Sequence, residues 1–576
     1  MRQVSNPSMQ ALSEKFQSET FLCGVELLST RGSMFESRAR KTRSFASELA
    51  ESDRIDWVSI TDNAGGNPML APVALGKPIL YAGKEVVIHL SCKDFNRNGL
   101  ESEAWHLASE GFHNILSLSG DYPVRGEGGS AKPVFDIDSI GLLTMLSRMN
   151  DGLTHRQGKD GQEQKLERTT FFPGAVVTNF KLHENEVVPQ YLKLEKKVEC
   201  GARFIINQIG YDSRKIHELR VYMDRHDMRE VPLVGNVFVL TPRAARFFHG
   251  LRFPGVVVSD DLLALCQAQA KSPDKGKAFF LELAAKQMAI YRGLGYRGAY
   301  FGGVHQSADL AKIFDIEASF SENDWKQFAR EIRFSRPGEF FLHAEDSETG
   351  LADPERLNPE YEESLRTRKP TKNVTWGYQA SKALHGVMFH REGVLARLGA
   401  KLVRSSQDST QGPKLLRTVE HLSKLLVFDC KDCGDCSLPD IAYLCPESQC
   451  AKNQRNGPCG GTRDGQCEVE EFECIWGRAY DRLKHEGKER DLLEHAPVIQ
   501  DQSLRGTSSW ANFWLGRDHH GPAFTGSKDA DASADASADA SADASADASR
   551  DASRDASADA SADASRDESS GTTADS

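Results

Sequence analysis

Residues 174–208 read GAVVTNFKLHENEVVPQYLKLEKKVECGARFIINQ, and this stretch decides the fold. It begins with a short β-branched run, GAVVTN (174–179), continues through a longer helical stretch, and ends with a second run, RFIINQ (203–208). A strand, a helix and a further strand in this order form the repeating unit of parallel sheets. We therefore predict two parallel strands joined by a helix.

The same alternation fills the chain from residue 20 to about residue 305. Six further runs of this kind are FLCGVEL (21–27), DWVSIT (56–61), EVVIHL (85–90), HNILSL (113–118), PLVGNV (232–237) and GAYFGGV (298–304). Eight runs at this spacing predict an α/β protein with a closed (β/α)8 TIM barrel over residues 15–315. In such a barrel the loops that follow the strands converge at one end and carry the chemistry.

Polar residues stand at or just after the predicted strand ends. They are Glu26, Thr61, His89, Gly120, Asp121 and Gln208. One polar residue near a strand end is often only a turn former or a hydrogen-bonded core group. Because the ends of five predicted strands converge on one mouth, the joint pattern favours a functional site there.

The chain changes character beyond the predicted barrel. Residues 316–400 are less regular and predict a connecting region, residues 401–486 a small cysteine-rich module, and residues 487–576 a polar exit with a repeat tail. The tail repeats Ala-Asp-Ala-Ser from Lys528 onward and has no aromatic or branched apolar residue. Such a segment cannot offset its ordering entropy, so we expect an acidic, disordered tail.

Charge and hydropathy limit the partners. Residues 528–576 contribute −9 of the net charge of −12, so the rest of the chain is near neutral and does not suggest nucleic acid. The N-terminus, MRQVSNPSMQALSEKFQSET, has no apolar signal core, and no run approaches the roughly 18 apolar residues of a spanning helix. We expect a soluble, cytoplasmic protein without a membrane partner.

Eight of the twelve cysteines lie within 45 residues, with the spacing C-x2-C-x2-C-x8-C-x4-C-x8-C-x7-C-x6-C. They are Cys430, Cys433, Cys436, Cys445, Cys450, Cys459, Cys467 and Cys474. In a reducing compartment a dense cysteine set indicates metal rather than disulfides. Eight thiolates suit two four-coordinate sites, for zinc or for iron–sulfur clusters. The other four, Cys23, Cys92, Cys200 and Cys266, fall in barrel elements, where buried thiols are ordinary packing.

Two glycine-rich segments and two isolated histidines could each have either a functional or a purely structural role. GLGYRG (293–298) matches the dinucleotide pattern GxGxxG, but it follows a helix and precedes a strand, so we interpret it as a helix stop. GDYPVRGEGGSAK (120–132) is either an anion-binding loop using Arg125 or Lys132, or a mobile surface loop. His183 and His305 are isolated from other metal-type ligands, which favours hydrogen-bonding or surface roles.

Several of these segments together resemble the methylenetetrahydrofolate reductases. They are VELLSTRG (25–32), VSITDNAGGNP (58–68), IHLSCKD (88–94), LSLSGDYP (116–123) and FFPGAVVTNFKLHENEVVPQYLKLEKKVECGARFIINQIGYDSRKIHEL (171–219). The resemblance spans roughly residues 15 to 305. CGDCSLPDIAYLCPESQCAKNQRNGPCGG (433–461) and CIWGRAYDR (474–482) resemble the cysteine-rich module that accompanies such reductases in some bacteria.

The resemblance implies a barrel enzyme of one-carbon metabolism and methionine biosynthesis that uses FAD to reduce 5,10-methylenetetrahydrofolate by ping-pong hydride transfer. It implies that Glu26 is the general acid, that Asp121 acts beside the flavin and the folate, and that Gln208 binds the pterin. Family positions that line the FAD correspond to Thr61, His89, Gly120, Asp121, Asn179, His183, Lys193 and Lys197. Lys193 and Lys197 are four residues apart, hence on one helix face, where they can reach a phosphate.

The chain departs from the family pattern at Ser119, where some relatives carry arginine, at Asp62, and at Lys181, where a carboxylate can occur. These changes and the cysteine module leave the electron donor open between NAD(P)H and a redox protein such as ferredoxin. A homo-oligomer is also left open. Two alternatives to the reductase remain: a folate-dependent protein of methyl-group catabolism, and a non-catalytic electron-transfer or scaffold subunit.

Overall fold

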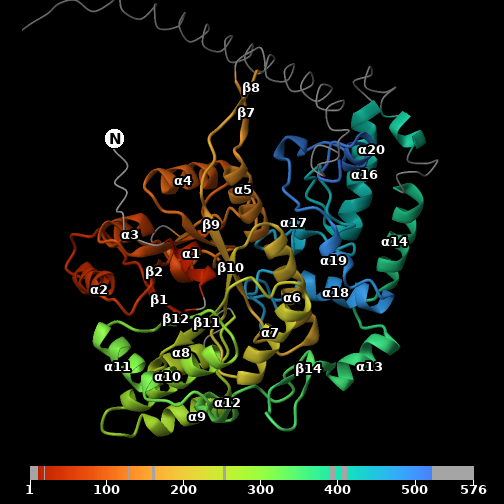
Figure 1. The fold of residues 1–576 in the computed structure, drawn as a ribbon. Coiled ribbons are helices and arrows are strands. Elements are labelled where there is room, and N and C mark those ends of the chain that lie inside the picture. The colour runs from red at the N-terminus through yellow and green to blue at the C-terminus, as the bar shows by residue number, and fades with distance from the viewer. Residues whose placement is uncertain are drawn as a thin grey trace, which may run out of the picture.

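The computed structural model describes residues 11–18, 20–126, 129–157, 162–250, 255–389, 397–401, 403 and 412–521. Its N-terminal half is a barrel, and a smaller helical module lies at one side of it (Figure 1). The predicted repeat tail lies outside the described residues.

Eight parallel strands close the barrel in the order β1-β12-β11-β10-β9-β4-β3-β2. They are β1 (Leu22–Leu27), β2 (Trp57–Ile60), β3 (Glu85–Ser91), β4 (Asn114–Leu118), β9 (Phe172–Val177), β10 (Phe204–Asn207), β11 (Leu233–Phe238) and β12 (Gly298–Gly302). Each strand coincides with one of the eight runs found in the sequence, so the predicted fold class is confirmed. The closed circle leaves no unpaired sheet edge within the barrel.

The barrel is filled at its N-terminal end. Helix α1 (Leu12–Gln17) places Phe16 inside, where its ring stacks on Phe204 at a centroid distance of 5.6 Å and lies 5.7 Å from Trp57. Gly24 makes room for this layer, because a Cβ there would lie 2.0 Å from the Trp57 ring. Interior space for polar chemistry therefore lies toward the opposite, C-terminal end of the strands.

Helices surround the barrel on the outside (Figure 1). They are α2 (Ala39–Glu51), α3 (Pro72–Tyr81), α4 (Arg97–Ser109), α5 (Ser139–Asp151), α6 (Glu184–Glu199), α7 (Ser213–Arg225), α8 (Pro242–Gly250), α9 (Asp260–Gln269), α10 (Lys277–Gly293), α11 (Ser307–Ala318) and α12 (Asp324–Glu331). Two hairpins interrupt the βα alternation after β4: β5 (Arg125–Gly126) with β6 (Gly129–Ser130), and β7 (Thr154–Gln157) with β8 (Gln162–Lys165). The GDYPVRGEGGSAK segment thus contains a short, exposed hairpin at Arg125.

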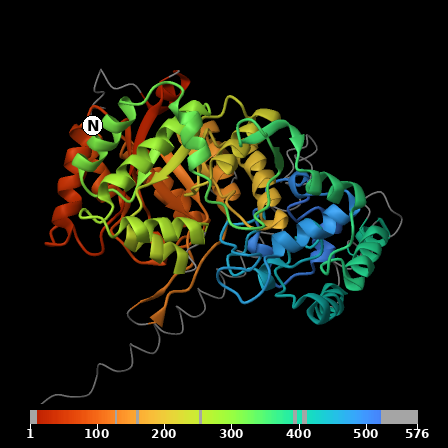
Figure 2. The same ribbon diagram turned by 90° about the horizontal axis from the view of Figure 1, so that it is seen from below.

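The second half of the chain forms the helical module. Its elements and those leading to it are β13 (His343–Glu345), β14 (Ala352–Leu357), α13 (Pro359–Thr367), α14 (Trp376–Met388), α16 (Gly412–Phe428), α17 (Pro446–Gln449), α18 (Ile475–Glu486), α19 (Asp491–Glu494), η2 (Gln502–Leu504) and α20 (Ser509–Leu515). Both views place the module against the side of the barrel that carries α6, and α18 packs on α6 (Figure 2). Among the described residues, no helix is both long and apolar enough to cross a membrane.

The segment predicted as a polar exit lies on this module as far as residue 521. Asp501 donates its backbone N–H to Asp435, and Ser508 donates its hydroxyl to Glu420 at 2.6 Å. Because of these contacts we propose that the module includes residues 487–521, so that it extends to residue 521 instead of ending at residue 486.

Candidate active site at the barrel mouth

Four interior side chains from neighbouring strands form a polar group near the C-terminal end of the barrel. Glu26 of β1 pairs in register with Ser59 of β2, and the Ser59 hydroxyl lies 2.9 Å from Nε2 of His89 on β3. Tyr300 of β12 lies 3.5 Å from the same His89 nitrogen and donates its hydroxyl to Glu26. The barrel thus places Glu26 and His89 in one group, with Tyr300 in contact with both.

Burial sets the protonation of this group. Desolvation raises the pKa of the Glu26 carboxyl to about 7, although the hydrogen bond from Tyr300 lowers it. Desolvation also lowers the pKa of His89 to about 4, so its imidazole is neutral at physiological pH. Because no imidazolium cation stands beside Glu26 to stabilise its ionised form, the carboxyl carries a proton in a large fraction of molecules at pH 7.

The predicted residues at the ends of β2 and β4 form the rim beside this group. The Thr61 hydroxyl accepts from the Ser29 N–H at 3.2 Å. The Asp121 carboxylate accepts from the Gly65 N–H at 2.7 Å, which ties the loop after β4 to the loop after β2. The Gly120 carbonyl accepts from the Lys452 ammonium at 2.8 Å, so a residue of the module takes part in the rim.

Two amide side chains complete the mouth from β10 and β11. The Gln208 carbonyl oxygen accepts from the neighbouring Ile209 N–H at 2.9 Å. Asn236 pairs in register with Tyr300, and its buried Oδ1 has no hydrogen-bond partner among the described residues. A buried acceptor without a donor is costly, so Asn236 suits a bound heterocycle that presents an N–H.

Three of the predicted cofactor residues do not face the mouth. Asn179 is fully buried, and its amide donates to the Lys215 carbonyl at 2.9 Å. His183 is exposed at the N-terminus of α6 and lines a surface groove with Lys369 and Asp464. Lys197 lies between α6 and the barrel, where its ammonium donates to the Val176 carbonyl at 2.5 Å. The cofactor roles of these residues stay predictions.

The module presents one loop, residues 452–462, to the ends of β4 and β9. The Lys193 ammonium donates to the Gln454 carbonyl oxygen at 3.3 Å and to the Gly457 carbonyl at 3.0 Å. Gly457 has φ +108°, and a Cβ there would lie 2.7 Å from the Lys193 stem. The sequence predicted that Lys193 contacts a phosphate. In this structure its ammonium instead donates to the side-chain oxygen of Gln454 and the backbone carbonyl of Gly457.

Two of the departures from the family pattern contact the same loop. Ser119 donates its hydroxyl to Gln454 at 3.0 Å. Lys181 is buried and donates its ammonium to the Gly460 carbonyl at 2.6 Å and to the Thr462 carbonyl. The third departure, Asp62, stays within the barrel and accepts from the Ser91 hydroxyl at 2.6 Å. Ser119 and Lys181 thus hold the module against the barrel by hydrogen bonds to this loop.

Replacing Lys181 by methionine is expected to loosen this loop. The change leaves two buried carbonyls without their donor, at a cost of about 1–3 kcal/mol each. Hydrogen–deuterium exchange of the full chain should therefore speed up at residues 452–462. Lys312→Met, at an exposed lysine of α11, is the matched control and should leave exchange unchanged. Equal protection of the loop in both variants would show that Lys181 does not hold it.

The second thiol quartet lies at the base of this loop. Cys450, Cys459, Cys467 and Cys474 converge on a cavity of about 20 Å³ that Lys452 and Gln454 also line. Backbone N–H groups two residues ahead point at two of the sulfurs, from Gly461 to Cys459 at 3.4 Å and from Val469 to Cys467 at 3.5 Å. Such N–H donors stabilise a thiolate, so the quartet has the surroundings of a metal-binding group.

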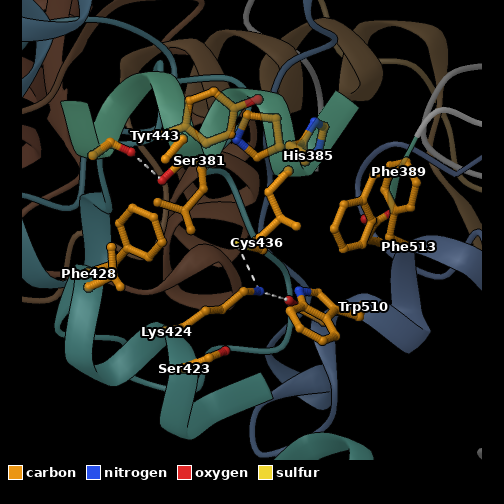
Figure 3. A pocket seen from close by; sticks show the side chains of 18 of the residues that line it. Ser381, His385, Phe389, Ser423, Lys424, Phe428, Cys436, Tyr443, Trp510 and Phe513 are labelled. Carbon is orange, nitrogen blue, oxygen red and sulfur yellow. Dashed lines mark hydrogen bonds between the residues drawn. The ribbon is translucent and has the colours of Figure 1, made fainter. Parts of the chain in front are cut away.

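The first quartet, Cys430, Cys433, Cys436 and Cys445, lies beside α16. Cys436 raises the pKa values of Cys430, Cys433 and Cys445 electrostatically, in addition to the effect of their burial, so the four thiols are close neighbours. The Lys424 ammonium lies 3.7 Å from the Cys436 sulfur, at the wall of an apolar pocket (Figure 3). A buried cation therefore lies beside this quartet.

Ser59, Asn236 and Tyr300 were not singled out in the sequence. All three lie inside recognised strand runs, at positions that alternate with outward-facing residues. The signal that could have found them is this alternation, because a polar residue in phase with Glu26 or His89 must point into the barrel.

The structure thus defines a closed parallel (β/α)8 barrel with a buried carboxyl near the C-terminal ends of its strands and a cysteine-rich module beside it. Residues 35–289 match the sequence model of methylenetetrahydrofolate reductase, and residues 411–503 match the one described as Methylene-tetrahydrofolate reductase C terminal. The chain belongs to the methylenetetrahydrofolate reductase family, a family of oxidoreductases.

Solved structures with similar folds cover the barrel half. An uncharacterized protein from Clostridium thermocellum that binds two copies of 5-methyl-5,6,7,8-tetrahydrofolic acid matches at 11% identity and a TM-score of 0.38, over 53% of this chain and 96% of that one. Dihydropteroate synthase from Stenotrophomonas maltophilia matches at 11% identity and a TM-score of 0.28, over 52% and 94%. At these scores the two likenesses carry no argument about the site.

Proposed function

We propose that the protein reduces 5,10-methylenetetrahydrofolate to 5-methyltetrahydrofolate with FAD as its cofactor. The observation that carries the proposal is the Glu26 carboxyl, held in the barrel mouth with its pKa near 7. A carboxyl with this pKa can give up a proton at neutral pH, whereas an ordinary glutamate is ionised there. A scaffold protein has no need to bury an acid beside Tyr300 and His89.

The residues of the mouth fit a flavin. The Oδ1 of Asn236, which has no hydrogen-bond partner among the described residues, would accept a hydrogen bond from an N–H of the heterocycle, and Thr61, His89, Gly120 and Asp121 lie at or after the C-terminal ends of β2, β3 and β4. Lys193 and Lys197, which the sequence assigned to the FAD phosphates, do not fit that role as placed, because their ammonium groups donate to the Gly457 and Val176 carbonyls. When bound, FAD supplies the hydride that protein side chains cannot.

Glu26 would act on the folate itself. The bond between N10 and the methylene carbon breaks as N10 takes the proton of Glu26, and the methylene carbon then accepts hydride to become the methyl group. Tyr300 would keep the carboxyl aimed into the mouth, and the neutral His89 ring holds Tyr300 and Ser59 without adding a charge. Gln208, at the end of β10, would hydrogen-bond the pterin.

Four thiolates suit either a tetrahedral zinc ion or a cluster in which each thiolate binds a different iron. Zinc has no redox chemistry, whereas a cluster can pass single electrons to a flavin that must be reduced. We therefore propose [4Fe–4S] clusters and a redox protein of the ferredoxin type as the electron donor.

An absorbance spectrum with metal analysis tests the proposal. Anaerobically purified full-length protein should be yellow-brown, bind added FAD, contain iron, and reduce 5,10-methylenetetrahydrofolate when supplied with reduced methyl viologen. Protein that refuses FAD and leaves the folate unchanged would overturn the reductase assignment. Zinc in place of iron would instead leave the barrel chemistry standing and make nicotinamide the donor to test.

A further inference from the structure

A second type of metal-ligating group lies in the module, made by Asp440, His519 and His520 and here named the Asp–His group. Asp440 ends the cysteine-bearing loop CGDCSLPD, whereas the two histidines follow α20. Nε2 of His519 lies 3.0 Å from one Asp440 oxygen, and Nε2 of His520 lies 2.9 Å from the other. The three ligand atoms all lie within 4.8 Å of one another.

The far sides of both imidazoles are held by further carboxylates. Nδ1 of His519 hydrogen-bonds Asp435, and Nδ1 of His520 lies 3.4 Å from Asp518. Histidines that bind metals commonly donate their second N–H to a carboxylate, which fixes the tautomer and the ring orientation. This arrangement directs both Nε2 atoms toward Asp440 and leaves them to share a ligand there.

The group is buried and strongly acidic. The side chains of Asp435, Asp440 and Asp518 are at most 5% exposed, and His519 is 2% exposed. With neutral imidazoles, these three carboxylates place a charge of −3 in one small volume, which is unfavourable without compensation. A divalent cation reduces this charge to −1. Protonation of both imidazoles would also reduce the charge to −1, and a metal ion that binds the imidazoles displaces these protons.

The site has room for an external ligand. His520 is 22% exposed, and with Asp518 it lines the apolar pocket of about 330 Å³ in which His385, Phe389 and Phe513 gather (Figure 3). His519 and His520 lie outside residues 411–503, the range that matches the family's C-terminal model. The group is also distinct from the thiol quartets, although Cys433 donates to the Asp435 carbonyl at 3.3 Å.

We propose that Asp440, His519 and His520 bind one divalent transition-metal ion, Zn²⁺ by their ligand chemistry. Two imidazoles and one carboxylate are a donor set that zinc takes in proteins, with water in a remaining position. The ion would fasten residues 518–521 to the cysteine-bearing loop and so close the module from its C-terminal side. This site is independent of the reaction in the barrel.

The test compares metal contents of the full-length chain. Wild type, the double variant His519→Gln/His520→Gln and the control His385→Gln are loaded with ZnCl₂, freed of loose metal on a chelating resin, and analysed for zinc and iron. His385 lines the same pocket without belonging to the group. We expect the double variant to hold one zinc per chain less than wild type and the control, with iron equal in all three. Equal zinc in the three proteins would overturn the proposal.

A second measurement covers the case in which the double variant folds poorly. Asp440→Asn keeps the size of the side chain, and CoCl₂ replaces zinc as a coloured probe. Wild type should show the weak visible bands of Co²⁺ bound by nitrogen and oxygen, and Asp440→Asn should lose them. If wild type shows only sulfur-to-cobalt charge-transfer bands, the Asp–His group is an ion-paired network and binds no metal.

Discussion

Replacing Glu26 by glutamine is expected to abolish reduction of the folate while sparing reduction of the bound flavin. A positioned general acid contributes about 10²–10⁴-fold, so the half-reaction with 5,10-methylenetetrahydrofolate should slow by that factor. Glutamine keeps the size of the side chain and can still bond Tyr300, but it has no proton to give N10. Stopped-flow absorbance of the flavin separates the two half-reactions.

The pH dependence of the wild-type enzyme follows from the same carboxyl. Its pKa is raised from 4.5 to about 7, and the acid acts in its protonated form. The folate half-reaction should therefore be fastest below pH 7 and decline as the pH rises through about 7. Tyr300→Phe is the matched variant: it removes the hydrogen bond that lowers the pKa of Glu26, so the decline should move to higher pH.

A measurement of thermal stability is the control that shows whether the Glu26→Gln variant folds. A raised pKa means that the folded state holds its proton more tightly than the unfolded chain, so this contribution is complete below pH 4.5 and is lost as the pH passes 7. Glutamine never ionises. The melting temperature of Glu26→Gln should therefore match or exceed that of wild type at pH 8. The difference between the two melting temperatures should shrink as the pH is lowered. Equal losses in both half-reactions of a well-folded variant would contradict the role of Glu26 as proton donor.

The barrel could be predicted because short stretches of sequence determine each of its strands and helices. Each β-branched run lies between helical stretches, and eight such runs leave few topologies other than a closed barrel. Glu26, His89 and Asp121 could be assigned to one mouth for the same reason, since strand ends in a parallel barrel converge whatever the details of the loops.

Docking of the module could not be predicted, because it depends on contacts between residues far apart in the chain. Lys181 and Gly460 are 279 residues apart, and Lys452 and Gly120 are 332 apart. A spacing of four correctly placed Lys193 and Lys197 on one helix, but it could not show that the Lys193 ammonium meets carbonyls of the module. Asn179 and His183 follow β9 in the same loop, yet one is buried and the other exposed, and short-range pattern does not distinguish these outcomes.

The thiol quartets could be counted from the sequence but not paired. Spacing alone allows many divisions of eight cysteines. The fold divides them in chain order, with Cys430 to Cys445 in one group and Cys450 to Cys474 in the other. The second quartet lies next to the loop that contacts Gly120 and Thr178, so it is the one adjacent to the barrel mouth.

Replacing Cys459 by serine is expected to remove the metal of the second quartet. Serine lacks the soft sulfur that iron and zinc prefer, so iron should fall by about four atoms per chain if the quartet holds a cubane cluster. The loop at residues 452–462 should also lose its anchor beside the cavity. Cys200→Ser, at a half-buried cysteine of the barrel, is the matched control and should keep the full iron content.

Kinetics then show what that metal does. If electrons reach the flavin through the second quartet, turnover driven by reduced ferredoxin should fall to background in Cys459→Ser. Folate reduction by flavin that has been reduced photochemically should persist, because Glu26, Tyr300 and His89 are untouched. Loss of both activities would make the quartet a structural support of the mouth. Full iron content together with full turnover would contradict the assignment of Cys459 as a metal ligand.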